Sequence, residues 1–145
     1  SNCIFGEVDT IANTAAVEDV WRQNEDAVDL SGNYQLSEFV SDQFRQTLST
    51  GKPVVVNDVA EDVRTAENSA NFQALKIGSF INTPFVSDGD LKFLLGVYRH
   101  EPYEWQAEEI ELLRELMTRI WTRIERARAE DALRESEERF RHMAD

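Results

Sequence analysis

The last third of the chain has a continuous helical pattern of apolar and polar positions, with no proline or glycine from Trp105 to Met143. Apolar residues recur there with the alternating spacing of three and four that defines a heptad seam. The residues of this seam are Ile110, Leu113, Met117, Ile120, Ile124 and Ala127. The pattern predicts one long helix that pairs with a partner helix.

A second apolar stripe accompanies the seam in the first half of this helix only. It consists of Leu112, Leu116 and Trp121, so the turns from Ile110 to Ile124 can contact both a globular body and a partner. From Glu125 onward the residues are mostly Glu, Arg and Ala, which is typical of a helix surrounded by solvent. We therefore expect the second half of the helix to project from its domain.

Upstream of the long helix, alternating apolar and polar positions predict two strands and a loop. The strands cover Cys3–Val8 and part of Asn13–Arg22. The polar stretch Gln23–Asn33, with Ser31 and Gly32 as turn residues, is expected to form a surface loop.

Two short helices and a buried strand are predicted next. Ser37 is expected to cap a helix that stops at Gly51, and Thr65 to cap a shorter helix that stops at Gly78. Between them, the β-branched run Pro53–Val56 predicts a strand that is buried on both faces.

The clearest local signal is a hairpin. The strand patterns Ser79–Val86 and Leu91–Tyr98 flank a turn with Asp88-Gly89 at its centre, and Asp-Gly is favoured there because both residues tolerate positive φ. Strands that are grouped in this way, rather than alternating with helices, predict an antiparallel α+β sheet with helices on its faces.

Composition restricts the class of function. The 145 residues, 41% of them hydrophobic, suffice for one core and one projecting helix. Asp and Glu outnumber Lys and Arg by 28 to 15, and the net charge of -13 disfavours nucleic acid and direct membrane contact. A single cysteine, Cys3, excludes internal disulfides and suggests a reducing compartment. No apolar run approaches the ~18 residues of a membrane span, so a cytoplasmic location is expected.

Several segments resemble the GAF domains of bacterial sensor histidine kinases. They are Gly51–Val59, Ala74–Phe80, Thr83–Leu91 and Leu95–Val97. The resemblance implies a central antiparallel sheet of about six strands, with helices on one side and a small-molecule pocket on the other. It assigns residues 1–124 to a GAF domain whose N-terminal helix is missing. One departure is Gln106, where the family often has Ser or Thr to cap the last helix.

The end of the chain has a resemblance of its own. Residues 133–145 are similar to the opening of a PAS domain, which makes residues 125–145 a helical linker and the truncated start of that domain. This implies a fragment of a larger signalling protein, a histidine kinase in a two-component system, with PAS and kinase domains downstream in the same chain.

Few residues could carry chemistry of their own. His142 lies near acidic residues, but no Asp or Glu follows it directly to act as the adjacent base of a phosphoacceptor histidine. His100 has no second His or Cys at ligand spacing. A reductase of the GAF fold would need catalytic cysteines, which Cys3 alone cannot supply. We therefore predict no catalytic residue and no metal site in this fragment.

Ligand binding is argued from the expected pocket alone. Four large aromatic residues stand at strand ends and on the covering helices, where the pocket would lie; they are Trp21, Tyr34, Phe39 and Phe72. They could line a pocket or fill it, and core packing is the favoured interpretation. Cys3 is in the wrong place to anchor a bilin, and the signature of cyclic-nucleotide-binding GAF domains is absent. No bilin, haem or cyclic nucleotide is predicted, which leaves an unidentified small molecule.

These patterns predict a regulatory or sensory domain without catalysis, which relays ligand binding or conformational state through its C-terminal coiled-coil helix. Two protomers are expected to pair along that helix as a homodimer, because an unpaired seam would expose apolar surface to water. The alternative is a constitutive dimerisation spacer whose pocket is filled and which binds no ligand.

Overall fold

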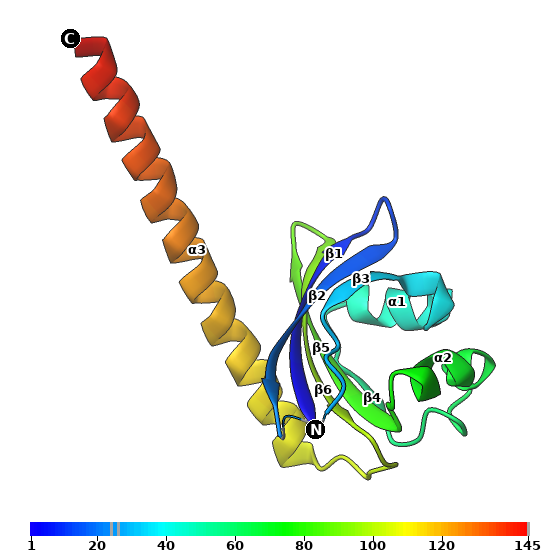
Figure 1. The fold of residues 1–145 in the computed structure, drawn as a ribbon. Helices are drawn as coiled ribbons and strands as arrows, with labels where there is room; N and C mark the ends of the chain where they lie inside the picture. The colour runs from blue at the N-terminus through cyan, green and yellow to red at the C-terminus, as the bar shows by residue number, and fades with distance from the viewer. Residues whose placement is uncertain (24, 26, 145) are drawn as a thin grey trace.

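The structure is a computed structural model that describes residues 1–23, 25 and 27–144. Over these residues a six-stranded antiparallel sheet separates two short helices on one face from one long helix on the other (Figure 1). The predicted fold class is confirmed. The elements in chain order are β1 (Asn2–Asp9), β2 (Thr14–Arg22), β3 (Gly32–Gln35), a 3-10 turn (Leu36–Glu38), α1 (Asp42–Ser49), β4 (Val54–Val56), a second 3-10 turn (Ala66–Asn68), α2 (Ser69–Ala74), β5 (Ser79–Ser87), β6 (Asp90–Arg99) and α3 (Ala107–Ala144).

The sheet has the strand order β3-β2-β1-β6-β5-β4. Side chains alternate along each strand, so the two faces belong to two separate apolar clusters. Phe80 and Leu94 pack on the side of α1 and α2, whereas their neighbours Ile81, Phe93 and Leu95 pack on the side of α3. Because helices cover both faces, residues 79–84 of β5 and 93–96 of β6 are buried without interruption.

The β5–β6 hairpin is confirmed. Its ladder runs from the pair Ser79 and Arg99 to the pair Ser87 and Asp90. Asp88 and Gly89 have φ angles of 54° and 80°, the positive values that a type I′ turn requires.

Strand β3 is a correction to the predicted loop Gln23–Asn33. Gly32–Gln35 pairs in antiparallel fashion with Thr14–Val17 of β2 at one edge of the sheet. These four residues show no apolar alternation, so the pattern gives no sign of a strand. The free backbone groups of β2 provide the partner, and tertiary pairing decides the conformation.

The start of α1 differs from the prediction. Ser37 lies in the 3-10 turn, and Ser41 is the N-cap, whose Oγ accepts a hydrogen bond from Phe44 N at 3.3 Å. The helix stop at Gly51 is as predicted: φ is 86°, and the Gly51 amide donates to Leu48 O at 3.0 Å. Phe44 and Leu48, one turn apart, are the buried residues of this helix.

Thr65 and β4 also differ in detail from expectation. The Thr65 hydroxyl does not cap a helix but donates to Val59 O at 2.8 Å in the interior. In the edge strand β4, Val54 and Val56 are fully buried, whereas Val55 on the other face is only half-buried. The prediction of burial on both faces therefore holds for one face.

Helix α3 begins two residues later than its pattern suggested. Trp105 is buried outside the helix, where its indole Nε1 donates to Val56 O at 3.2 Å. Gln106 precedes the first helical residue, and its backbone N–H donates a hydrogen bond to Glu109 Oε1 at 3.0 Å. Glu109 therefore supplies the side-chain half of a capping box, without a Ser or Thr at the cap.

The first half of the predicted seam packs against the sheet of its own chain. Leu113 and Met117 are only 6% and 2% exposed, and Ile120 packs in the same cluster. Leu112 and Leu116, two of the three residues of the second stripe, are instead 57% and 38% exposed. Trp121, the third residue of that stripe, packs on Phe85 and Phe93 of the sheet. The seam therefore contacts the body in this half of the helix, together with Trp121, and shielding it there requires no partner.

The second half of α3 projects beyond the sheet (Figure 1). Residues 125–143 are exposed, including Ala127, Leu133 and Phe140, whereas Ile124 is half-buried. The helix has 38 residues, which corresponds to a length of about 57 Å at 1.5 Å per residue. Despite this length it is too rich in charge to cross a bilayer, and no other helix in the described part of the chain could do so.

Candidate functional site

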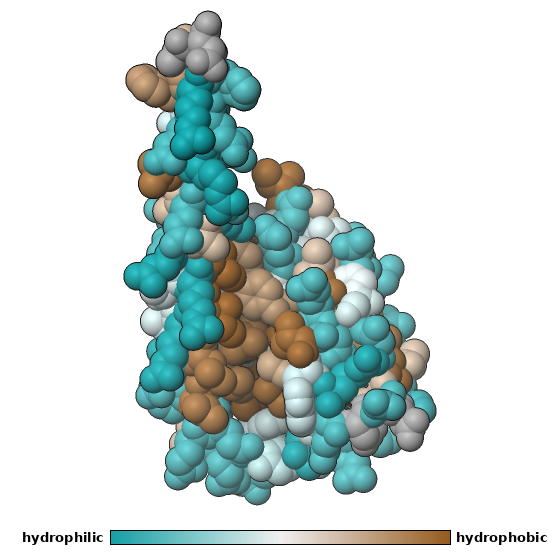
Figure 2. All heavy atoms as spheres, turned by 60° about the vertical axis from the view of Figure 1, so that its left-hand side comes forward, coloured by the Kyte–Doolittle hydropathy of each residue, from teal (hydrophilic) through white to brown (hydrophobic). Residues whose placement is uncertain are grey.

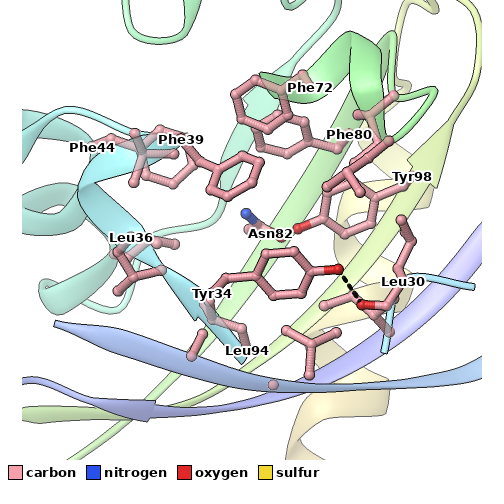
Figure 3. A pocket seen from close by; sticks show the side chains of 18 of the residues that line it. Leu30, Tyr34, Leu36, Phe39, Phe44, Phe72, Phe80, Asn82, Leu94 and Tyr98 are labelled. Atoms are coloured by element: carbon pink, nitrogen blue, oxygen red, sulfur yellow. Dashed lines mark hydrogen bonds between the residues drawn. The ribbon is translucent and has the colours of Figure 1, made fainter. Parts of the chain in front are cut away.

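A cavity of about 90 Å³ lies between the sheet and the segments that cover its α1 and α2 face (Figure 3). Its floor includes Ile4, Gly6 and Leu94 from the adjacent strands β1 and β6. The covering side comes from β3, α1 and α2 and from the loops beside them. Most of the lining side chains are apolar, so the cavity suits an apolar body.

Aromatic rings form an arc around the cavity. Tyr34, Phe39, Phe72, Phe80 and Tyr98 follow one another with ring centroids 5.5, 5.3, 5.4 and 5.2 Å apart. The first two contacts are edge-to-face and the last two are stacked, both of which are favourable arrangements for aromatic pairs. The arc connects the edge strand β3 to the central strands through α2.

An amide is among the few polar groups of this lining. Asn82 of β5 is only 5% exposed, and its Oδ1 accepts a hydrogen bond from Tyr98 Oη at 2.8 Å. Its nitrogen points into the cavity (Figure 3). Among the described residues none accepts a hydrogen bond from Asn82 Nδ2, so the cavity contains a free donor.

Both tyrosine hydroxyls of the site are engaged within the protein. Tyr34 Oη donates to Leu30 O at 2.7 Å. Burial raises the pKa of Tyr98 well above its ordinary value, and the hydrogen bond to Asn82 offsets only part of the rise. Burial, followed by the charges of Asp29 and Asp19, also raises the pKa of Tyr34. Both phenols therefore remain protonated donors at neutral pH.

Cationic groups lie mainly beside the cavity rather than in it. Lys76, Arg99 and His100 line a neighbouring polar crevice of about 250 Å³, which shares some of the cavity's lining residues, Tyr98 among them. Arg45 does line the cavity, but its guanidinium pairs with Asp42 and donates to Asn13 Oδ1.

The structure brings together three of the four aromatic residues singled out in the sequence. Tyr34, Phe39 and Phe72 line the cavity. Trp21 lies elsewhere: it is 56% exposed, and it pairs with Cys3, whose side chain packs on the opposite face of the sheet. A bulge in the β1–β2 ladder at this point changes which side chains share a face.

The remaining candidates for chemistry lie apart from the cavity. Cys3 is half-buried on the α3 face, and burial, with the nearby Asp19 charge, raises the pKa of its thiol. His100 is exposed, with Nδ1 3.1 Å from Lys76 O, and His142 is exposed on the projecting part of α3. The described residues contain no group of three His, Cys, Asp or Glu that could hold a metal ion.

Comparison with known proteins identifies the family. A family model described as "GAF domain" matches residues 2–125, and the chain belongs to this family. GAF domains are sensory and regulatory modules that are generally non-catalytic. Comparison with curated protein sequences gave no match.

Solved structures share the fold. The phycocyanobilin-bound GAF domain of a cyanobacterial phytochrome is similar with a TM-score of 0.73 and 15% identity, over 90% of this chain and 77% of that one. A far-red cyanobacteriochrome photoreceptor is similar with a TM-score of 0.67 and 20% identity, over 86% of this chain and 76% of that one. A domain of a two-component sensor histidine kinase protein from Sinorhizobium meliloti 1021 is similar with a TM-score of 0.60 and 20% identity, over 92% and 85%.

Proposed function

We propose that this domain senses a small molecule bound in the aromatic-lined cavity and relays its occupancy through α3. The observation that carries the proposal is the free donor of Asn82 in a cavity whose lining is mostly apolar. Ligand sites typically combine apolar walls with a few convergent polar groups.

The size of the cavity limits the ligand. Its volume of about 90 Å³ is below the ~150 Å³ of an engineered cavity that binds benzene. The occupant is therefore at most a single ring, and the walls have to move apart to admit one. Two of the similar GAF domains hold phycocyanobilin and phycoerythrobilin. A bilin has several rings, and Cys3 lies on the other face of the sheet, so the proposal does not extend to bilins.

Strand β5 is the proposed route from ligand to helix. Phe80 and Asn82 face the cavity, whereas Ile81 and Phe85 between and beyond them face α3. Phe85 stacks on Trp121 of α3 with ring centroids 4.1 Å apart. A shift of β5 that depends on ligand would therefore bias how α3 packs on the sheet.

The proposed output lies downstream in a longer cytoplasmic chain. The similarity of residues 133–145 to a PAS opening and the fold shared with a sensor histidine kinase domain support a relay toward PAS and kinase domains. Two protomers would pair through α3 as a coiled coil. In this homodimer the exposed Leu112 and Leu116 contact the partner, and Ile124 and Ala127 continue the contact above the sheet.

Ligand binding is tested by thermal unfolding and native mass spectrometry with a panel of single-ring compounds. A ligand present at 100 times its Kd should stabilise the fold by about 2.7 kcal/mol. Ala15→Leu fills the cavity, which Ala15 lines, and should abolish the response. Ala16→Leu is the matched control, because Ala16 is exposed and not part of the lining. A panel with no stabilising or retained compound would contradict the proposal.

A constitutive spacer is the second candidate, and the small volume of the cavity favours it. In a spacer the aromatic arc is simply core, and no compound alters the unfolding temperature. Ala15→Leu would then stabilise the domain by filling empty volume, while the oligomeric state stayed the same with and without any compound.

A further inference from the structure

The Asn82 amide is held in one orientation by its neighbours. Tyr98 Oη donates to Asn82 Oδ1 at 2.8 Å, and because burial keeps the phenol protonated, the oxygen side of the amide is always occupied. The nitrogen is thereby turned toward the cavity (Figure 3). Gly96 lies opposite Asn82 in β6, and its lack of a side chain leaves the space that the side chains of Asn82 and Tyr98 occupy.

We infer that Asn82 determines ligand specificity, and that the cavity takes a small, neutral, single-ring aromatic molecule with one hydrogen-bond acceptor. Asn82 Nδ2 donates to that acceptor while the ring packs against the aromatic arc. The inference rests on the proposed ligand-binding function and names the class of ligand for the same cavity.

The aromatic walls of the cavity favour an aromatic ligand. Tyr34 and Phe72 approach the space around the Asn82 nitrogen from different sides (Figure 3). Their rings present faces and edges to one small volume, an environment that complements the quadrupole of another ring. A volume of about 90 Å³ leaves no room for a second ring.

Charge complementarity makes the ligand neutral. A carboxylate at Asn82 would be buried without a cation beside it, and an unpaired buried charge is costly. The charge of Arg45, which lines the cavity, is already paired with Asp42, although its buried Nε has no hydrogen-bond partner among the described residues. The side chains of Lys76, Arg99 and His100 line the neighbouring crevice instead. The acceptor that matches an uncharged amide N–H is a ring nitrogen, a carbonyl or an ether oxygen.

Benzene and pyridine form the matched pair of probes, because they share size and shape and differ in one acceptor. Their Kd values are measured on the whole chain by calorimetry or thermal shift, at a pH where pyridine is neutral. For each protein we take the ratio of the affinity for pyridine to the affinity for benzene. The wild-type ratio is then divided by the Asn82→Leu ratio, because the cost of desolvating pyridine is the same in both proteins and cancels. We expect this quotient to be about three to ten, the value of one hydrogen bond.

Thr83→Val is the control variant. Thr83 is the next residue along β5, is similarly buried, and lies outside the cavity lining. Loss of its hydroxyl should therefore leave the pyridine-to-benzene affinity ratio unchanged. Tyr98→Phe provides a second test that does not depend on folding of Asn82→Leu. It frees the amide to rotate, and the ratio should fall toward that of Asn82→Leu.

The outcomes separate this inference from the proposed function. A quotient near one, with both probes bound, overturns the role of Asn82 but leaves the cavity as a ligand site. Tighter binding of benzoate than of pyridine overturns the neutral class. Absence of binding by all three compounds overturns both proposals.

Discussion

At the scale of single residues, Gly96 makes room for the Asn82–Tyr98 pair. A Cβ at position 96 would lie 2.7 Å from both Asn82 Oδ1 and Tyr98 Cε2, and 3.3 Å from Ile4 Cγ1. Gly96→Ala should therefore lower the free energy of unfolding by about 1–3 kcal/mol, the usual cost of overpacking a core. Urea unfolding measures this change.

Gly6→Ala is the comparison for that experiment. Gly6 is also buried and also lines the cavity, but its added Cβ would meet no atom closer than 3.6 Å. We expect little loss, or a gain of up to about 1 kcal/mol from the reduced entropy of the unfolded chain. An equal loss for both variants would show that crowding at the Asn82–Tyr98 pair is not the cause.

The buried phenol of Tyr98 predicts sensitivity to alkaline pH. Its pKa is raised in the folded protein from an ordinary value of 10.0, so the folded state holds the proton more tightly than the unfolded chain does. The stability from this group is complete below pH 10 and is lost as the pH rises above it. Chemical unfolding at several alkaline pH values should show a steeper decline in wild type than in Tyr98→Phe. Equal slopes would contradict this assignment.

At the scale of elements, Glu109 anchors the start of α3. Its Oε1 accepts hydrogen bonds from the backbone N–H of Gln106 at 3.0 Å and from Tyr103 Oη at 2.9 Å. Glu109→Ala should reduce the free energy of unfolding by about 0.5–2 kcal/mol, as for other lost helix caps. Glu108→Ala controls for charge in the first turn, because Glu108 is exposed. A similar loss in both variants would point to the helix dipole instead of the cap.

The elements that could be predicted from the sequence are those whose conformation is determined by neighbouring residues in the chain. The β5–β6 hairpin and α3 were predictable because turn chemistry and helical periodicity are local. Strand β3 was not, because Gly32–Gln35 has no alternation of its own and is a strand only through pairing with β2. Ser37 and Ser41 both suit an N-cap, and Ser41 takes this role because Ser37 lies in the separate 3-10 turn Leu36–Glu38.

The same reasoning applies to the candidate site. Tyr34, Phe39 and Phe72 could be singled out as large aromatic residues in covering segments, but their meeting point depends on the tertiary fold. Asn82 was missed, although a signal existed: it is an amide that directly follows the apolar pair Phe80–Ile81 in a central strand. Trp21 was misplaced because a bulge changes the face of its strand, and bulges leave little trace in the pattern.

At the scale of the whole molecule, α3 has one face on its own sheet and another that is open. Figure 2 shows a solvent-exposed apolar surface beside the helix. The double variant Leu112→Glu/Leu116→Glu should convert a dimer to a monomer at tens of micromolar without loss of fold, as measured by analytical ultracentrifugation.

Met117→Glu tests the opposite face of the same helix. Met117 is 2% exposed against the sheet, so a buried charge there should unfold the domain and not merely separate protomers. A wild-type chain that is already monomeric, or a double variant that remains dimeric, would rule out pairing through Leu112 and Leu116.

The stack of Trp121 on Phe85 gives the domain an optical reporter of its own. Trp121 lies 4.1 Å from Phe85 and 5.2 Å from Phe93, between ring centroids, where the helix meets the strand that also forms the cavity. The chain has three tryptophans, and replacing Trp21 and Trp105 by phenylalanine leaves Trp121 as the sole source of indole emission. The wavelength and lifetime of that emission then follow the junction between helix and sheet in solution, with no attached dye.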